Sequence, residues 1–248
     1  MDARKKKIEC DNAAEEMRLD RKKKNVFIMA HCLSDAPHTS ERLLFKDYYE
    51  ALKETLCIAS KIKNVNWILK IHPDFERYHG DNGVRLLREY GGDNIALFDN
   101  RWSNEVAYRL ADVMITVRGT IGVEASAYGI PVVLTGESWY SKFGFTINAF
   151  SREKYTKVLN NLHRIRRLSD EKRDLAQRVL CAYLMGCNEI KIDKDDFGKD
   201  LYENMLSDKS IKAKNRSTMR ILREYTAVHD LENCYISRRC LELFDELR

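Results

Sequence analysis

The stretch that most constrains the fold covers residues 112–136 and reads DVMITVRGTIGVEASAYGIPVVLTG. An apolar run at 113–117 is followed by an Arg-Gly-Thr turn at 118–120, a segment of small residues, a Gly-Ile-Pro turn and a second apolar run at 132–134. This order of strand, turn, helix, turn and strand predicts a βαβ unit. Parallel strands need such crossovers and are buried by them, so the stretch predicts an α/β domain.

The same alternation extends upstream to residue 25. Three compact apolar runs predict further strands, at 25–31, 64–71 and 94–98. Three segments with helical periodicity predict helices, at 46–62, 81–90 and 103–110. Five strands that alternate with helices predict a doubly wound, parallel, Rossmann-like sheet over residues 25–150.

The flanking regions have a different character. Residues 1–24 are rich in charge, and we expect either a tail or an exposed helix. The aromatic segment after Gly136 predicts a loop that either folds over a cleft or covers the edge of the sheet. Residues 151–248 form a predicted helical C-terminal region, with helices at 151–167, 170–185, 195–206, 215–228 and 235–247 and a hairpin or loop at 188–200.

Composition excludes several classes of protein. No apolar run approaches the ~20 residues of a membrane span, and MDARKKKIEC lacks the apolar core of a signal peptide, so we expect a cytoplasmic protein. Basic runs at 4–7 and 21–24 are usually solvated, and weak contact with the inner face of an anionic membrane is the open alternative. No motif indicates nucleic-acid binding.

The cysteines and acidic clusters do not predict a metal site or cofactor. The seven cysteines include no CxxC pair, and the spacings of Cys181/Cys187 and Cys234/Cys240 do not fit zinc. The acidic residues at 193–196 lack the glycine and glutamate of a calcium loop, and no DxD pair lies near a strand end. We expect free, buried thiols and no metal.

His72 and Pro73 follow the predicted strand at 64–71. The proline fixes the backbone after the strand and aims His72 out of the carboxyl edge of the sheet. An imidazole in that place can donate a hydrogen bond to a phosphate. The alternative is a histidine that only caps the strand.

The turn at Arg118, Gly119 and Thr120 lies at the same edge and leads into a helix, whose first N–H groups attract anions. Arg118 can pair with pyrophosphate or with a carboxylate. Glu124 follows Thr120 by one turn on the same helical face, where it can hold sugar hydroxyls. The alternative is that Gly119 and Gly122 serve only the turn and close helix packing.

Three polar residues, His31, Asp35 and His38, follow the first predicted strand. If the strand order is that of a doubly wound fold, they face the same cleft as His72. They can then bind a sugar or an acceptor, with Asp35 as the proton acceptor. The alternative is that Asp35, Pro37 and their neighbours form an ordinary turn.

Four motifs in this order, MAHCLSDAPH, DYYEALKETL, NWILKIHP and DVMITVRGTIGVEASAYGIPVVLTGESWY, resemble a known family. They resemble the C-terminal, nucleotide-binding half of two-domain GT-B glycosyltransferases that build bacterial surface and capsular polysaccharides. The nearest group is similar to the capsule-synthesis enzymes that use CMP-activated Kdo, and sialyltransferases share the His-Pro. The resemblance covers about residues 25–150.

The resemblance implies a metal-independent glycosyltransferase, without cofactor, that moves a sugar from a nucleotide-activated, CMP-linked donor to a glycan or glycolipid acceptor. It implies that His72 and Pro73 mark the donor phosphate, that Gly119, Thr120 and Gly122 form a second phosphate-binding element, and that Glu124 lies at the nucleoside or sugar. The paired hydroxyl residues of many relatives are replaced here by the turn at 118–120, which leaves the nucleotide open.

In such enzymes the acceptor site and the catalytic carboxylate belong to an N-terminal domain. The resemblance therefore implies that the chain is a fragment, that a partner chain supplies this half, or that Asp35 is the base. Three other functions stay open. They are an inactive donor-binding subunit, a CDP-glycerol-type polyol-phosphate transferase and a UDP-sugar epimerase.

Overall fold

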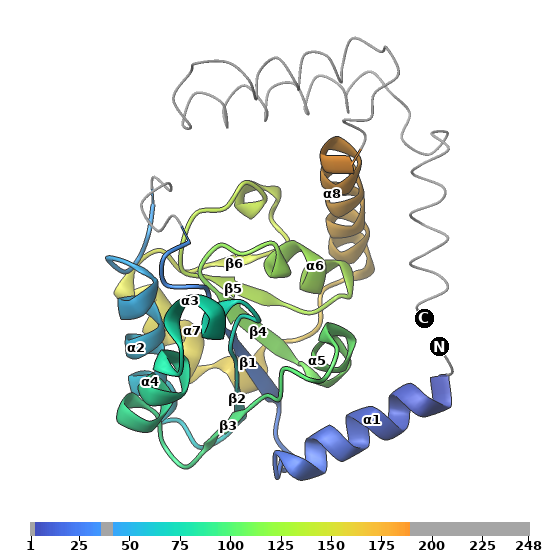
Figure 1. Cartoon of the computed structure of the whole chain (residues 1–248). Coiled ribbons are helices and arrows are strands. Elements are labelled where there is room, and N and C mark those ends of the chain that lie inside the picture. The colour runs from blue at the N-terminus through green and yellow to red at the C-terminus, as the bar shows by residue number, and fades with distance from the viewer. Residues whose placement is uncertain (1–2, 36–41, 189–248) are drawn as a thin grey trace, which may run out of the picture. The chain divides into compact units, whose positions relative to one another are not determined.

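The computed structural model describes residues 3–35 and 42–188 (Figure 1). The chain divides into two units after Arg173, and helix α8 (Asp170–Asn188) is the last described element. The fold and the candidate site described below belong to the first unit. No helix in the described ranges is long and apolar enough to cross a membrane.

A single sheet of six parallel strands forms the centre of the first unit, in the order β3-β2-β1-β4-β5-β6. The strands are β1 (Asn25–Met29), β2 (Asn66–Lys70), β3 (Ile95–Leu97), β4 (Val113–Thr116), β5 (Val132–Leu134) and β6 (Ile147–Asn148). The apolar runs that predicted β1, β2 and β4 are buried almost throughout, as strands covered on both faces must be. The predicted Rossmann-like, doubly wound fold class is confirmed.

Helices cover both faces of the sheet (Figure 1). Those packed together on one face are α2 (Tyr48–Ala59), α4 (Asn82–Tyr90) and α7 (Arg152–Asn160). The other face carries α5 (Asn104–Leu110) and α6 (Ile121–Ala127), and α1 (Ala3–Glu16) packs against α5. Helix α2 begins where the Asp47 carboxylate accepts the N–H of Glu50 at 2.8 Å, which satisfies one of the unpaired donors of the first turn.

A hydrophobic core lies between the sheet and the helices α2, α4 and α7. Alternate strand residues such as Val26, Ile28 and Trp67 pack there against Leu52 and Leu56 of α2. Buried polar atoms in this core are paired. The Tyr155 and Thr55 hydroxyls lie 2.7 Å apart, and Thr55 donates to the carbonyl of Ala51, so neither hydroxyl is left unsatisfied.

The predicted number of five strands is wrong, because the segment after Gly136 adds β6. Ile147 pairs with Val133 of β5, so this segment covers the edge of the sheet, as one of the two alternatives predicted. The strand has two residues, too few to give a periodic signal. The Tyr140 hydroxyl of the same segment donates a hydrogen bond to the carbonyl of Gly119 and so braces the turn after β4.

Several helix predictions are also revised. Of the two alternatives for residues 1–24, the helix is found, and its Ala13 is buried. The helix expected at 151–167 ends at Asn160 and is followed by a short 3₁₀ turn, Leu162–Arg164. The short helix α3 (Phe75–His79) was not predicted. The predictions for 195–206, 215–228, 235–247 and most of 188–200 lie outside the described residues.

The order of the strands reverses between β1 and β4. The chain leaves β1 toward α2 on one face and leaves β4 toward α6 on the other, so the two connections part at the carboxyl edge of the sheet. In doubly wound sheets, ligands bind in the crevice at this switch point. The residues predicted to bind a ligand follow β1, β2 and β4, the three central strands of this edge.

Candidate ligand-binding site

A small pocket opens at the switch point, between the carboxyl ends of β1 and β4 and the first turns of α2. Its lining includes Ala30 and His31 after β1, Tyr48 and Thr55 of α2, and Thr116 at the end of β4. The lining is polar and apolar in about equal parts, and the pocket's volume of about 20 Å³ has room for a water molecule. The pocket and its neighbours His72 and Arg118 form what we call the candidate site.

His31 joins the ends of β1 and β4. Its Nε2 lies 3.1 Å from Thr116 Oγ1 and accepts the backbone N–H of Arg118 at 3.3 Å, so the ring proton of the neutral form is on Nδ1. The ring stacks on Tyr48, with centroids 4.5 Å apart. Burial lowers the pKa of His31 from 6.5 to about 4. His31 is therefore neutral near pH 7 and acts as a polar brace.

Arg118 offers a hydrogen-bond donor that lacks an acceptor. Its backbone is held on both sides, by His31 and by Ser138, whose hydroxyl donates to the Arg118 carbonyl at 3.1 Å. The side-chain nitrogen NH1 is buried and has no hydrogen-bond partner among the described residues. A buried donor left unpaired costs about 1–3 kcal/mol, more when it is charged. An anionic oxygen at this nitrogen would remove that cost.

Among the described residues, Arg118 makes no ion pair, and its NH1 has no hydrogen-bond partner. Burial raises the pKa of Tyr48 and of Tyr140, and in both cases the Arg118 charge opposes that rise. The same charge adds to the lowering of the His31 pKa. The guanidinium thus sets a positive potential over the stacked His31 and Tyr48 and over Tyr140.

His72 is held in one tautomer. Its Nδ1 accepts the backbone N–H of Asp74 at 3.2 Å, so Nδ1 carries no proton in the neutral ring. Cys32 Sγ lies 3.3 Å from the same nitrogen, and burial raises the pKa of this thiol, which therefore keeps its proton and donates it. The proton of the neutral imidazole is then on Nε2, which has no partner among the described residues. This N–H is free to donate to a ligand, and Pro73 is exposed beside it.

The loop after β1 is described only in part. Asp35 is exposed, and its charge opposes the lowering of the His31 pKa and adds to the raised pKa of Cys32. The Asp35 carboxylate therefore influences the candidate site through its negative charge, which shifts the pKa values of His31 and Cys32. Its predicted role as a base stays a prediction, and His38 lies outside the described residues.

The glycines after β4 are explained by packing. A Cβ on Gly119 would lie 3.1 Å from the His31 ring, and one on Gly122 would lie 2.1 Å from the Tyr140 hydroxyl, closer than atoms can approach. Thr120 is exposed at the start of α6, and its side chain makes no capping hydrogen bond. The predicted role of Gly119, Thr120 and Gly122 as a phosphate-binding element stays a prediction.

Glu124 lies on the side of α6 that faces α5. Its carboxylate accepts a hydrogen bond from the Tyr108 hydroxyl at 2.6 Å, and the Tyr108 ring stacks on Tyr128 at 4.6 Å between centroids. Burial and the Glu124 charge raise the pKa of Tyr108, which keeps this hydroxyl a donor. One carboxylate oxygen is thus used inside the protein, and contact of Glu124 with a nucleoside or sugar stays a prediction.

Lys70, the last residue of β2, is a further charged residue that was not predicted to belong to the site. Its side chain is 5% exposed, its Nζ donates to Asn100 at 3.2 Å, and the same nitrogen lies 5.1 Å from the centroid of the Phe98 ring. Burial lowers its pKa. The signal was a lysine inside the apolar run NWILKIHP, since lysine is almost never buried without a reason. It adds a second cation near the carboxyl edge.

The part of the chain that the structure describes contains no group of three His, Cys, Asp or Glu side chains placed to hold a metal ion. The thiols of Cys10, Cys32, Cys57 and Cys181 are free. The side chains of Cys187, Cys234 and Cys240 and the acidic residues at 193–196 are not described.

Comparison with known proteins gives distant structural likenesses. No protein-family model matches the sequence, and no characterised protein matches it at a significant level. Among solved structures, the beta Kdo 2,7 transferase of Thermosulfurimonas dismutans KpsC is 20% identical and has a TM-score of 0.41, with 71% of this chain and 52% of that chain covered. The Neisseria meningitidis UDP-GlcNAc 2-epimerase bound to UDP-GlcNAc is 14% identical, with a TM-score of 0.42 and coverages of 67% and 42%.

The wall teichoic acid polymerase TagF is a third match, 13% identical with a TM-score of 0.32 and coverages of 96% of this chain and 47% of that chain. The chain spans about half the length of these three matched chains, from 42% to 52%. At these TM-scores the likenesses carry no information on function.

The lowered pKa of His31 predicts a loss of stability in acid. The unfolded chain takes up a proton on this imidazole below pH 6.5, whereas the folded protein resists protonation until about pH 4. The contribution of His31 to the free energy of unfolding is therefore complete above pH 6.5 and decreases as the pH falls. The decrease amounts to about 2 kcal/mol at about pH 5. Urea unfolding at about pH 7.5 and pH 5 should show that His31→Gln loses correspondingly less free energy than the wild type. The exposed His163→Gln should decline like the wild type, and an equal decline in all three proteins would refute the burial of His31.

The contact between Cys32 and His72 predicts the tautomer of His72. The ¹⁵N spectrum of the imidazole at alkaline pH should show a protonated Nε2 and an unprotonated Nδ1. Cys32→Ala removes one of the two donors to Nδ1 and should raise the population of the other tautomer, whereas Cys32→Ser keeps a donor and should change it less. A proton on Nδ1 in the wild type would contradict the hydrogen-bond assignment.

Proposed function

We propose that the chain is the donor-binding part of a glycosyltransferase that moves a sugar from a nucleotide-activated, CMP-linked donor to a surface polysaccharide. The observation that carries the proposal is the buried, unpartnered NH1 of Arg118 beside the switch point of the sheet. A phosphate oxygen is the acceptor that a guanidinium binds best in such a place. The sequence motifs at His72 and at 118–120 support a nucleotide-sugar as the source of that phosphate.

We expect two further donors, at the carboxyl end of β2, to contact the same ligand. His72 has its Nε2–H free at the end of β2, and the Lys70 ammonium lies buried on the same strand. A phosphodiester or pyrophosphate offers several acceptor oxygens and can engage more than one of these groups. His31, being neutral, adds no charge, and its part is to hold Arg118 in place through the backbone N–H.

The proposed chemistry follows from where charge develops. When the bond between the anomeric carbon and the phosphate oxygen breaks, the electron pair leaves with the nucleotide, and its phosphate gains negative charge. Arg118 and His72 would stabilise that charge without a metal ion, because both donors are already oriented before the reaction. The acceptor hydroxyl attacks the anomeric carbon, which inverts its configuration, and its proton passes to a base for which Asp35 is our candidate.

The acceptor side of the proposed reaction depends on the base. The described residues form one parallel sheet, and Asp35 is an exposed carboxylate that influences the candidate site only through its field. The exposed position of Asp35 favours a second candidate function, a donor-binding subunit whose acceptor site and base come from a partner chain. Nucleotide binding without sugar transfer would identify that subunit, and activity with CDP-glycerol would indicate a polyol-phosphate transferase instead.

Arg118→Met tests the proposal, because it removes the unpaired donor and keeps an apolar stem. Calorimetric titration with CMP and CDP should show roughly ten- to hundredfold weaker binding, the cost of one hydrogen bond to a charged group. The unliganded variant should unfold at the same or a higher urea concentration than the wild type, because a buried unpaired donor has been removed. If Arg118 had only a structural role, the unliganded Arg118→Met variant would instead unfold at a lower urea concentration than the wild type.

The matched control is Arg109→Met on α5, where the arginine pairs with Glu105 at 3.0 Å and lies toward the amino edge of β4. It should leave affinity for both nucleotides unchanged. Equal affinity of the wild type and Arg118→Met would refute a donor site at Arg118.

A further inference from the structure

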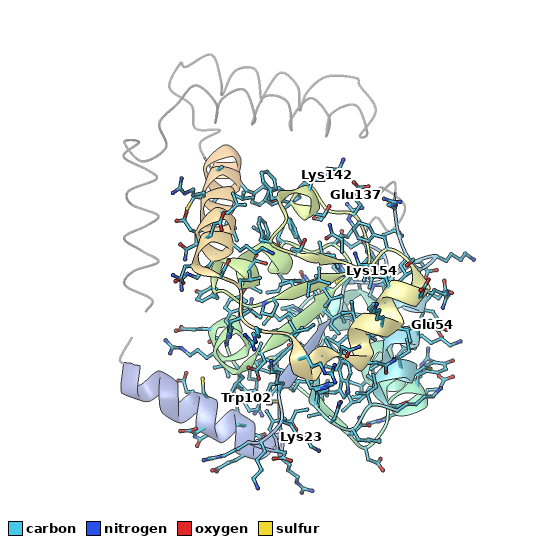
Figure 2. The ribbon with its side chains drawn as sticks, turned by 180° about the vertical axis from the view of Figure 1, so that it is seen from behind. Lys23, Glu54, Trp102, Glu137, Lys142 and Lys154 are labelled. Atoms are coloured by element: carbon cyan, nitrogen blue, oxygen red, sulfur yellow. The ribbon has the colours of Figure 1, made fainter. Side chains whose placement is uncertain are left out.

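The amino edge of the sheet, opposite to the candidate site, gathers basic side chains from three segments that are far apart in the sequence. These are residues 18–24 before β1, 61–64 before β2 and 161–167 after α7. Figure 2 shows Lys23 at the lower end of the first unit, far from Glu137 and Lys142 at the other end. We call the surface formed by the three segments the amino-edge surface.

Hydrogen bonds link the three segments to one another. The backbone N–H of Asp20 donates to the Asn66 side chain at 3.2 Å, which links the first segment to β2. The Asn64 amide lies 3.1 Å from Nδ1 of His163, which links the second segment to the third. The Lys24 ammonium donates to the carbonyl of Ile165, which links the first to the third. These hydrogen bonds bring the basic residues of the three segments close together on the folded chain.

The charge of this surface is large. The three segments contain ten basic residues and one acidic residue, Asp20. The basic residues are Arg18, Arg21, Lys22, Lys23, Lys24, Lys61, Lys63, Arg164, Arg166 and Arg167. The loops before β3 and β4 add Asp93 and Asp112, so ten positive and three negative charges leave a net +7, more than the +5 of the whole chain. The remainder of the chain is therefore slightly acidic.

Internal carboxylates neutralise little of this charge. Within the described ranges, Arg21 pairs with Glu15 at 3.6 Å and Lys23 with Asp20 at 3.8 Å, and the other eight basic residues make no ion pair. Arg167 donates to the carbonyl of Ala111, a neutral group. Nine of the ten basic residues are exposed, and Lys24 is half-buried. Like charges held together without counterions attract an external polyanion.

We propose that the amino-edge surface binds the anionic headgroups of a lipid bilayer. The cations lie on separate loops along one edge of the sheet, as a surface that meets many headgroups at once requires. The three segments contain no Phe, Tyr or Trp on which nucleic-acid bases could stack. Binding at this edge leaves the carboxyl edge, with Arg118 and His72, facing the solution. The inference does not depend on the proposed function.

Co-sedimentation of the full chain with vesicles tests the proposal. The chain should sediment with vesicles of phosphatidylcholine and phosphatidylserine and stay in solution with phosphatidylcholine alone. Binding should fall steeply with added salt, which screens charges over ~10 Å at 0.1 M. No sedimentation with the phosphatidylserine vesicles would overturn the proposal.

A pair of double variants separates this surface from the net charge. Arg164→Glu with Arg166→Glu should weaken binding to the anionic vesicles roughly thirtyfold or more, since each basic residue contributes about a factor of five. The control is Lys154→Glu with Lys157→Glu on α7, the same change of charge at two exposed positions, of which Lys154 is labelled in Figure 2. The control should bind nearly as the wild type does, and equal losses in both double variants would refute a specific surface.

Two further measurements complete the test. CMP affinity and the urea midpoint of Arg164→Glu with Arg166→Glu should equal those of the wild type, so a failure of lipid binding is distinguishable from a failure of the proposed function. An RNA fragment added in competition should not displace the chain from the vesicles at equal phosphate concentration. Displacement by RNA would show that the surface binds nucleic acid and would overturn the lipid proposal.

Discussion

The hydrogen bond from the Arg118 backbone to the neutral ring of His31 is the interaction on which the candidate site depends. It joins the exits of β1 and β4 at the point where the strand order reverses. It holds the two connections together just before they part toward opposite faces of the sheet. Because burial keeps His31 uncharged near pH 7, the brace adds no positive charge beside the guanidinium, and Arg118 remains available for an anion.

The central strands and their exits were predictable from sequence, because strands buried on both faces are continuous apolar runs. His31, His72 and Arg118 each follow such a run, and parallel strands bring their carboxyl ends to one edge, so their gathering follows from the fold class. The details depended on contacts between distant residues. The contact of the Tyr140 hydroxyl with Gly122 and the contact of the Cys32 thiol with His72 join residues far apart in the chain. Neither contact produces a recognisable pattern in the local sequence. Strand β6 was missed because two residues have no period.

The two edges of the sheet differ in how they hold charge. At the carboxyl edge the cations are few and partly or wholly buried, as Arg118 and Lys70 show, and each has a fixed place. At the amino edge the cations are many, exposed and on flexible stems, in the segments 18–24, 61–64 and 161–167. A fixed, desolvated donor discriminates between ligands, whereas exposed cations on separate loops attract a broad surface of anionic headgroups. The contrast is consistent with a specific small-molecule site at one edge and a broad contact at the other.

The most direct test of the account is to map where a nucleotide binds. CMP and CDP would be titrated into ¹⁵N-labelled full-length protein while the backbone amides, the Arg118 guanidinium and the His72 ring are followed. The account predicts saturable shifts at residues 31, 72 and 118–120, with the Arg118 guanidinium signals moving most, and no change at 161–167. Shifts confined to other regions, or none at concentrations that saturate typical nucleotide sites, would contradict a phosphate site at the switch point of this sheet.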